Sequence, residues 1–256
     1  MRENPVKRRL RDGGVAVGTF VFEFATTGIA RLAAGAGAEF VVFDLEHTGW
    51  SLETLRGVLA TVVPPLVPVV RVPATEYHFI ARALDVGAMG VMVPMVETAD
   101  QARRVVQAAK YPPVGRRGAA FGVAHDDYRG GDILATMASA NDEGLLIAQI
   151  ETSAGVAHAE AIAAVDGIDV VWVGHFDLTS SLGIPGQFDH PDFVRAVRGV
   201  AAAARAHGKA AGFLCADVAC GRALLAQGFR ALAYGGDLGL YQKALRDGIA
   251  GLKRAD

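Results

Sequence analysis

The chain has 256 residues, of which 52% are apolar, and a formal net charge of -2. This length is enough for one large domain with a single hydrophobic core. A charge balance so close to neutral offers no basic surface for nucleic acid or for an anionic membrane. Glycine, proline or charged residues interrupt every apolar run well before the ~20 residues that a membrane-spanning helix needs.

Cysteine usage and the amino-terminal segment both bear on the compartment. Cys215 and Cys220 are the only cysteines, too few for a disulfide framework, and their apolar flanks suggest packed free thiols in a reducing environment. The basic run 7–11 is not followed by the apolar stretch of a secretory signal. A short solvated helix that ends at Gly13 explains this run better. We therefore expect a cytoplasmic protein with no membrane or nucleic-acid partner.

Short apolar segments recur along the chain and are separated by Ala-rich segments with helical spacing. Because the segments are apolar on both faces, they are typical of parallel strands covered by helices. Eight such strand–helix units in this length predict a single (β/α)8 TIM barrel domain over residues 1–256. An open doubly wound sheet is the alternative, but its glycine-rich phosphate loop is missing after the first strand. The expected strands are residues 15–21, 39–44, 66–72, 89–94, 145–151, 168–174, 209–214 and 230–235.

Polar side chains are concentrated where the predicted strands end. In a TIM barrel the active site lies at the carboxyl ends of the strands. The segment EFVVFDLEHTGW, residues 39–50, completes the second strand and continues into two carboxylates and an imidazole. Four strands therefore direct charged or amide groups to the same rim. These residues are Asp44, Glu46 and His47, Arg71, Gln149 and Glu151, and His175 and Asp177.

Glu151 and Asp177 are the predicted metal ligands. Two carboxylates on neighbouring strand ends repel each other unless a divalent cation joins them. Oxygen ligands with open coordination positions suit Mg²⁺ or Mn²⁺. The alternative is that Asp177 only caps the helix that follows its strand. The presence of Glu151 on the adjacent strand favours metal binding.

His47 and Arg71 are the other predicted functional residues at this rim. A carboxylate such as Asp44 beside an imidazole brings its pKa toward the working pH of a general base. A hydrogen-bonded structural histidine is the alternative. An arginine among Val and Pro neighbours is costly to bury unless it holds an anion, although Arg71 could simply pair with Asp44 or Glu46.

Five collinear motifs connect this sequence to a known family. They are FDLEHTGW (43–50), VVRVP (69–73), LDVGAMGVMVPMVETADQA (84–102), YPPVGRRG (111–118) and IAQIETSAGVAHAEAIAAVDGIDVVWVGHFDLTSSLG (147–183). Together they resemble the HpcH/HpaI aldolases, the metal-dependent class II pyruvate aldolases of the phosphoenolpyruvate/pyruvate barrel superfamily. The resemblance runs in order from about residue 4 to residue 250.

The resemblance implies a role for each motif residue. It makes His47 the acid/base residue and Arg71 the group that polarises the keto oxygen. It assigns the divalent metal, Mg²⁺ or Mn²⁺ with Co²⁺ as a further option, to Glu151 and Asp177. Asp44 would orient the imidazole of His47.

Substrate contacts and a supporting carboxylate follow from the same resemblance. Gln149 would contact the substrate, and the backbone N–H groups of Phe176 and Asp177 would hold the pyruvate carboxylate, as the start of a helix can. The family pattern also assigns Asp85 to supporting the histidine. Asp85 closes a helix that should end at the opposite face of the barrel, so it could reach His47 only from a neighbouring subunit.

The implied reaction is reversible cleavage of a 4-hydroxy-2-oxo acid into an aldehyde and pyruvate or hydroxypyruvate, through an enolate that the metal stabilises. Such an enzyme would resemble 4-hydroxy-2-oxoheptanedioate and 2-dehydro-3-deoxyglucarate aldolases. Candidate aldehydes include succinic semialdehyde, tartronate semialdehyde and lactaldehyde. Loop 119–132 departs from the family pattern, which leaves the aldehyde side open; Arg116, Arg117 and Arg129 are available to receive an anionic aldehyde.

Besides decarboxylation of oxaloacetate, which passes through the same enolate, two other functions remain open at this stage. An acyl-CoA lyase of the citramalyl or malyl type belongs to the same superfamily, but such chains usually carry a longer carboxy-terminal region for the CoA. A non-catalytic barrel that binds a keto acid is the second alternative. The presence of His47 and Arg71 together with both carboxylates argues against it.

The carboxy-terminal segment bears on assembly. The resemblance implies a homo-oligomer, often a hexamer, in which partner barrels exchange their last helices. Residues 237–252 place apolar side chains on one helical stripe, and the simpler interpretation is that this stripe closes its own barrel. We predict at least a dimer, with Asp85 of one subunit near His47 of the next. The stripe consists of Leu238, Tyr241, Leu245, Ile249 and Leu252.

Overall fold

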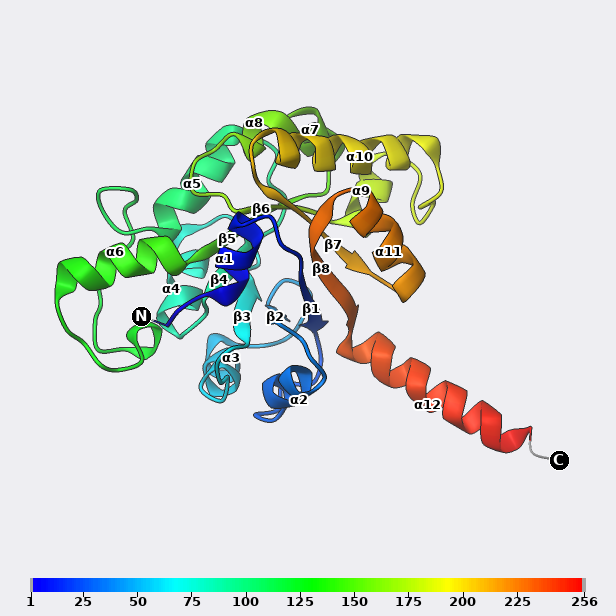
Figure 1. The fold of residues 1–256 in the computed structure, drawn as a ribbon, viewed down its shortest axis with the longest axis horizontal. Helices are drawn as coiled ribbons and strands as arrows, with labels where there is room; N and C mark the ends of the chain where they lie inside the picture. The colour runs from blue at the N-terminus through cyan, green and yellow to red at the C-terminus, as the bar shows by residue number, and fades with distance from the viewer. Residues whose placement is uncertain (1, 255–256) are drawn as a thin grey trace.

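The computed structural model describes residues 2–254, which form a closed barrel of eight strands alternating with helices (Figure 1). The strands are β1 (Ala16–Val21), β2 (Phe40–Asp44), β3 (Val67–Arg71), β4 (Gly90–Val93), β5 (Leu145–Ile150), β6 (Val170–Val173), β7 (Ala210–Cys215) and β8 (Phe229–Gly236). The helices are α1 (Pro5–Arg11), α2 (Ile29–Gly35), α3 (Leu52–Leu59), α4 (Tyr77–Asp85), α5 (Ala99–Ala109), α6 (Ile133–Glu143), α7 (Ser153–Ala157), α8 (Ala159–Ala163), α9 (His175–Ser181), α10 (Pro191–Ala206), α11 (Val218–Ala226) and α12 (Asp237–Lys253), with one 3-10 turn, η1 (Ala124–Asp126).

The predicted TIM barrel is confirmed. Each strand pairs in parallel with the next, and β8 pairs with β1 to close the sheet. Every residue of β2 to β6 is buried, as expected for strands with side chains inside the barrel on one face and helices on the other. The register aligns Asp44 with Arg71 across β2 and β3, which brings these two polar side chains to the same level.

Two layers of apolar side chains make up the core. One lies between the sheet and the surrounding helices, and the other fills the barrel interior. Trp172 of β6 is the largest fully buried side chain of the interior. A Cβ atom on Gly212 of β7 would lie 2.2 Å from the Trp172 ring, so this position needs glycine to admit the indole. Trp172 thus forms the floor beneath the carboxyl ends of the strands.

Helix α1 packs against the opposite end of the barrel. Its buried side chains Val6 and Leu10 join the interior cluster, so the helix is more than the solvated segment expected from its charge. Asn4, the N-cap, is fully buried and accepts a hydrogen bond from the Lys7 N–H at 3.0 Å. The Asn4 amide also donates to the carbonyl oxygens of Met89 and Glu143. This helix is a plug for the lower end of the barrel.

Beyond its first turns, helix α12 extends away from the barrel (Figure 1). The five apolar side chains of its stripe are between 41% and 82% exposed. The simpler interpretation, in which this stripe closes its own barrel, is therefore wrong. A groove of about 350 Å³ beside β1 and α2 remains open, and its lining is mostly apolar. Among residues 2–254, no helix has both the length and the hydropathy required to cross a bilayer.

Candidate active site

A cavity of about 390 Å³ lies at the carboxyl ends of the strands. The predicted residues His47, Arg71, Gln149, Glu151, Phe176 and Asp177 all contribute to its wall. The remaining wall is formed by Phe20, Phe22, Trp172, Val173, Gly174, His175 and Leu214. The structure therefore brings together six of the eight residues predicted from the sequence, from β2, β3, β5 and the β6–α9 junction.

Asp44 and Arg71 form the rigid part of this site. The Asp44 carboxylate, fully buried, accepts hydrogen bonds from Arg71 Nε at 2.6 Å and Nη2 at 2.9 Å. Burial would lower the pKa of Arg71, but the bonds and charge of Asp44 raise it above its ordinary value. The guanidinium also lies against the rings of Phe20 and Phe22, at 5.4 and 5.8 Å from their centroids. Arg71 is thus a fixed cation at the edge of the cavity.

Asp44 acts on His47 through the backbone. The two carboxylate oxygens of Asp44 also accept hydrogen bonds from the backbone N–H groups of Glu46 and His47, each at 3.1 Å. These bonds fix the turn after β2. The predicted contact with the imidazole is not seen in this chain. The imidazole is 57% exposed, and its Nε2 lies 3.7 Å from Glu46 Oε2. Glu46 is therefore the carboxylate beside the imidazole.

The sequence places Glu46 at the rim, but it gave no indication of a catalytic role for this residue. Its Oε2 lies 3.2 Å from Arg71 Nε, but that N–H is directed at Asp44, so this buried oxygen receives no hydrogen bond from residues 2–254. Burial raises the pKa of Glu46 to about 7, against the lowering effect of Arg71. Its position two residues after Asp44, at the same predicted rim, was the available signal.

Glu151 is held on both sides of its carboxylate. Its Oε1 accepts the Met95 N–H at 2.7 Å, and its Oε2 accepts Gln149 Nε2 at 2.6 Å. Burial nevertheless raises the pKa of Glu151 to about 7. A Cβ atom on Gly174 would lie 2.2 Å from Glu151 Oε2, so the glycine provides the space for this carboxylate. Gln149 therefore orients Glu151 in addition to facing the cavity.

Asp177 lies in the first turn of α9, directly after β6. Gly174 is the N-cap of this helix, and Asp177 makes no side-chain hydrogen bond with any residue from 2 to 254, which does not support the capping alternative. Its charge contributes to the raised pKa values of both Glu46 and Glu151. Since first-turn N–H groups have no partner within a helix, those of Phe176 and Asp177 remain available to an anion.

The donor set of this site fits a divalent cation. The negative charges of Glu46, Glu151 and Asp177 act on one another, and the nearby guanidinium of Arg71 is already hydrogen-bonded to Asp44. Within the described chain, no group of three or more His, Cys, Asp or Glu residues is arranged to hold a metal. Mg²⁺ commonly takes only one or two protein carboxylates and fills its shell with water and substrate oxygens. Glu151 and Asp177 match that pattern, and a cation between them would relieve their repulsion.

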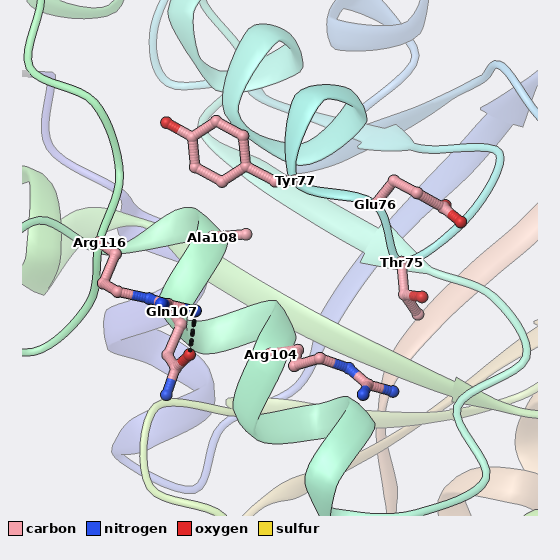
Figure 2. A pocket seen from close by; sticks show the side chains of 7 residues that line it. All are labelled: Thr75, Glu76, Tyr77, Arg104, Gln107, Ala108 and Arg116. Atoms are coloured by element: carbon pink, nitrogen blue, oxygen red, sulfur yellow. Dashed lines mark hydrogen bonds between the residues drawn. The ribbon is translucent and has the colours of Figure 1, made fainter.

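Asp85 and the loop arginines lie away from this cavity. Asp85 ends α4 and pairs with buried Arg117 at 2.6 Å. Arg129 pairs with Asp127 at 3.0 Å. Arg116 donates to Gln107 and lines a separate cavity of about 630 Å³, which lies outside the barrel against α5 and the start of α4 (Figure 2). In this chain, none of these groups lines the cavity at the strand ends.

A closed (β/α)8 barrel that gathers buried carboxylates and a fixed arginine at its strand ends defines an enzyme that stabilises a developing oxyanion. The sequence profile of "HpcH/HpaI aldolase/citrate lyase" matches residues 18–244. The chain belongs to this family, which confirms the resemblance described above, and it is a class II aldolase, a carbon–carbon lyase.

Individual relatives cover almost the whole chain. A 2-keto-3-deoxy-L-rhamnonate aldolase from Klebsiella pneumoniae is 39% identical over 251 residues, which are 98% of this chain and 93% of the relative. The crystal structure of an HpcH/HpaI aldolase from Desulfitobacterium hafniense superimposes with a TM-score of 0.93 at 30% identity, covering 100% of this chain and 98% of the other. A family protein from Burkholderia cenocepacia gives 0.91 at 32% identity, covering 98% and 99%.

Proposed function

We propose that this aldolase reversibly cleaves a 2-keto-3-deoxy sugar acid into pyruvate and an uncharged aldehyde, with hydroxypyruvate as a second possible donor in the reverse direction. The observation that carries the proposal is the convergence of Glu151, Asp177 and Arg71 on one cavity at the strand ends. Such a set can hold a 2-keto acid and stabilise the charge of its enolate.

Arg71 has the electrostatic role in this proposal. Asp44 occupies its Nε and Nη2 edges, and no residue from 2 to 254 accepts a hydrogen bond from Nη1. That nitrogen is available to the keto oxygen of the substrate, whose charge grows as the C3–C4 bond breaks. Because Asp44 fixes the guanidinium in advance, little reorganisation accompanies the reaction.

His47 has the acid/base role. In the cleavage direction its imidazole accepts the proton of the 4-hydroxyl group, the C3–C4 bond breaks, and the bonding pair passes into the enolate of pyruvate. Proton return to C3 then gives pyruvate. Glu46, 3.7 Å from Nε2, stabilises the imidazolium that forms in this step. In the direction of synthesis the same imidazole returns its proton to the new hydroxyl group.

Glu151 and Asp177 are the proposed ligands of Mg²⁺ or Mn²⁺, with Co²⁺ as an alternative. When bound, this cation would supply Lewis acidity at the keto and carboxylate oxygens of the substrate. The backbone N–H groups of Phe176 and Asp177 would bind the substrate carboxylate beside it. Gln149 keeps the Glu151 carboxylate in place for this purpose.

The proposed aldehyde is uncharged because, among residues 2–254, Arg71 is the only lysine or arginine that lines the cavity. Arg116, Arg117 and Arg129 do not line the cavity, whereas the apolar side chains of Phe22 and Leu214 do. The relative from K. pneumoniae is named for a deoxy sugar acid, and lactaldehyde is the neutral candidate among the aldehydes considered. This choice differs from the heptanedioate and glucarate substrates suggested by the sequence.

The test is an aldehyde panel with pyruvate or hydroxypyruvate as donor, in Mg²⁺, Mn²⁺, Co²⁺ or EDTA. We expect lactaldehyde to react with a higher kcat/KM than succinic or tartronate semialdehyde, and EDTA to remove turnover. The Glu151→Gln variant is the matched control for contaminating aldolases. Turnover that survives EDTA, or a preference for the anionic aldehydes, would contradict the proposal.

We also propose a homo-oligomer, such as a hexamer, in which α12 enters the groove of a partner barrel. The stripe on α12 is exposed, while the groove beside β1 presents Val17, Ile29 and Ala33. An eighth helix normally covers this part of a barrel, so the groove and the stripe are complementary in position and in chemistry. A monomer by light scattering would contradict exchange.

Asp85 has a possible role only in such an assembly. At the end of α4 it lies on the far face of its own barrel, so we propose that it reaches His47 of a neighbouring subunit. Two inactive variants, His47→Ala and Asp85→Ala, should then regain partial activity when co-assembled, because some sites receive both native residues. No recovery in mixed oligomers would restrict Asp85 to its pair with Arg117.

A further inference from the structure

The first residue of α12 is bound to a distant loop. The Asp237 side chain is buried, and its carboxylate accepts three successive backbone N–H groups of the loop after β1. These are the N–H groups of Phe22 at 2.9 Å, Glu23 at 2.9 Å and Phe24 at 2.7 Å. The N–H of Leu238, in the first turn of α12, also donates to Asp237 at 2.9 Å. One carboxylate thus joins the start of the helix to a loop more than 200 residues away in the sequence.

This loop forms part of the active-site wall. The Phe22 ring lies 5.8 Å from Arg71 Cζ and stacks on Phe20 with the ring centroids 5.4 Å apart. Both aromatic rings line the cavity that contains the predicted catalytic groups. On its other side, Phe22 packs against Gly236, where an added Cβ atom would lie 2.6 Å from the ring. The position of Phe22 therefore depends on the backbone at the start of α12.

The contact extends along the helix. Phe24 packs edge-on against Tyr241 of α12, with the ring centroids 5.6 Å apart. Asp237 also lines the apolar groove beside β1. A carboxylate that accepts several backbone N–H groups is among the stronger kinds of hydrogen-bonded contact, and here it also lies at the positive end of a helix. Asp237 thus lies between the groove and the catalytic cavity.

We propose that Asp237 is a positioning residue that holds residues 22–24 against Arg71 and so fixes the aromatic wall of the substrate cavity. Substrate does not touch Asp237; its effect passes through the loop backbone to the Phe22 ring. The helix that extends from the barrel is in this way coupled to the site. Only the consequence for turnover rests on the proposed function. The contact between Asp237 and residues 22–24, called the Asp237 clamp below, is a property of the fold.

The first test is amide hydrogen exchange in the full chain, which needs no turnover. Asp237→Asn keeps the volume of the side chain but replaces one acceptor oxygen with an NH2 donor, which opposes the N–H groups of the loop. We expect exchange at Phe22, Glu23 and Phe24 to accelerate at least ~10-fold, with β2 and β3 unchanged. The matched control is Asp247→Asn, an exposed position in the same helix that pairs with Lys243. Unchanged exchange at residues 22–24 would overturn the proposal.

The second test asks whether the effect passes through Phe22. Asp237→Asn should lower kcat/KM for aldol addition about 10-fold, because Arg71 loses its aromatic neighbour. In a Phe22→Ala background the same substitution should cost less than about 2-fold, since the ring that it positions is already gone. Equal costs in both backgrounds would overturn the proposal. Absence of aldol turnover in the wild-type protein would instead reject the proposed function. The hydrogen-exchange measurement would still test whether the Asp237 clamp holds residues 22–24.

A third variant reaches the same ring without touching Asp237. Gly236→Ala places a methyl group against Phe22, so we expect a similar loss in kcat/KM and a displaced ring. Gly239→Ala is the matched control, because its added methyl group meets no atom within 4 Å. This pair keeps the proposal testable if Asp237→Asn folds poorly. Equal activity of the two glycine variants would overturn it.

Discussion

The two ends of the barrel both contain buried polar groups, and they differ in the balance of charge among those groups. At the lower end, Glu143 accepts the Asn4 N–H at 2.5 Å and Arg8 Nη2 at 2.6 Å. Lys7 pairs with Asp169 at 3.2 Å and donates to the Gly144 carbonyl oxygen at 2.7 Å. Most charged groups around the α1 plug thus face an opposite charge or a carbonyl oxygen of the chain, whereas the buried Arg2 Nε has no hydrogen-bond partner among the described residues.

At the strand ends, buried carboxylates outnumber the cations. Asp44 is paired with Arg71, but Glu151 accepts hydrogen bonds from neutral donors only. Glu46 Oε2 receives no hydrogen bond from the described residues, and Glu46 and Glu151 both have pKa values raised to about 7. A fold does not gain stability from repelling carboxylates at low exposure. This excess of negative charge at the rim supports the proposed cation site.

Substitutions at the two ends of the barrel should have opposite effects on activity and on stability. Glu151→Gln or Asp177→Asn should lower metal-dependent turnover by roughly a thousandfold or more, because a ligand is lost. Stability of the metal-free protein should hold or rise, because one repelling charge is removed. Glu143→Ala should do the reverse, with unfolding free energy lower by about 1–3 kcal/mol and activity retained. Steady-state kinetics and urea unfolding of the three variants measure both effects.

Arg71→Lys should be nearly as damaging as Arg71→Ala. An ammonium group cannot bind Asp44 through two edges and also face the substrate oxygen. Loss of oxyanion stabilisation of this kind is worth ~3 kcal/mol, roughly a hundredfold in kcat. A loss of kcat in Arg71→Lys below about tenfold would make Arg71 a structural partner of Asp44.

Gly174→Ala should reduce activity through Glu151 alone. The backbone of Gly174 has φ −85° and ψ 91°, which alanine also adopts, so the expected effect is steric. The new methyl group would overlap the Glu151 carboxylate and displace it. Mn²⁺ affinity should fall about tenfold or more. Gly199→Ala, in α10 with open space around it, is the matched control and should leave Mn²⁺ affinity unchanged.

The smallest expected effect is on the pH dependence of stability. The folded-state pKa values of Glu46 and Glu151 are raised from 4.5 to about 7, so the folded protein binds more protons than the unfolded chain between these values. Their contribution to stability is complete below pH 4.5 and is lost as the pH rises through 7. Thermal unfolding of metal-free protein should therefore show this loss, and Mn²⁺ should restore stability at pH 8.

His175 and Lys110 change the pH dependence of stability in the opposite direction, so the contribution of the carboxylates has to be measured as a difference between two proteins. Burial lowers the pKa of His175 to about 4 and that of Lys110 to about 7, so both favour stability as the pH rises. Subtracting the profile of a Glu46→Gln, Glu151→Gln double variant isolates the two carboxylates. A difference profile that is flat from pH 5 to 8 would show that these groups titrate normally.

Sequence pattern was sufficient for the barrel because the strands are short and apolar on both faces and are separated by Ala-rich segments with helical spacing. The predicted segment 39–44 and the observed β2, Phe40–Asp44, differ by one residue. The direction of α12 could not be predicted in this way. Its stripe of apolar residues looks the same whether it covers its own barrel or another, so periodicity alone cannot separate the two.

The site was predictable to the level of the rim but not of individual contacts. Asp44, Arg71 and Glu151 follow from their places at strand ends, since parallel strands bring those ends together. The pairing of Asp44 with Arg71 depends on the register between β2 and β3, and Glu46 reaches the imidazole only because of a turn that Asp44 fixes. Likewise, Asp237 joins elements at opposite ends of the chain, which no local pattern reveals.

The central proposal is that Glu151 and Asp177, at the strand ends, form a cation site. Direct titration of the metal-free protein with Mn²⁺ at pH 8, followed by electron paramagnetic resonance of the free ion, tests it most directly. We predict one bound Mn²⁺ per chain in the wild type and in Glu143→Ala, and loss of that binding in Glu151→Gln and Asp177→Asn. Equal Mn²⁺ binding by Glu151→Gln and the wild type would contradict the account.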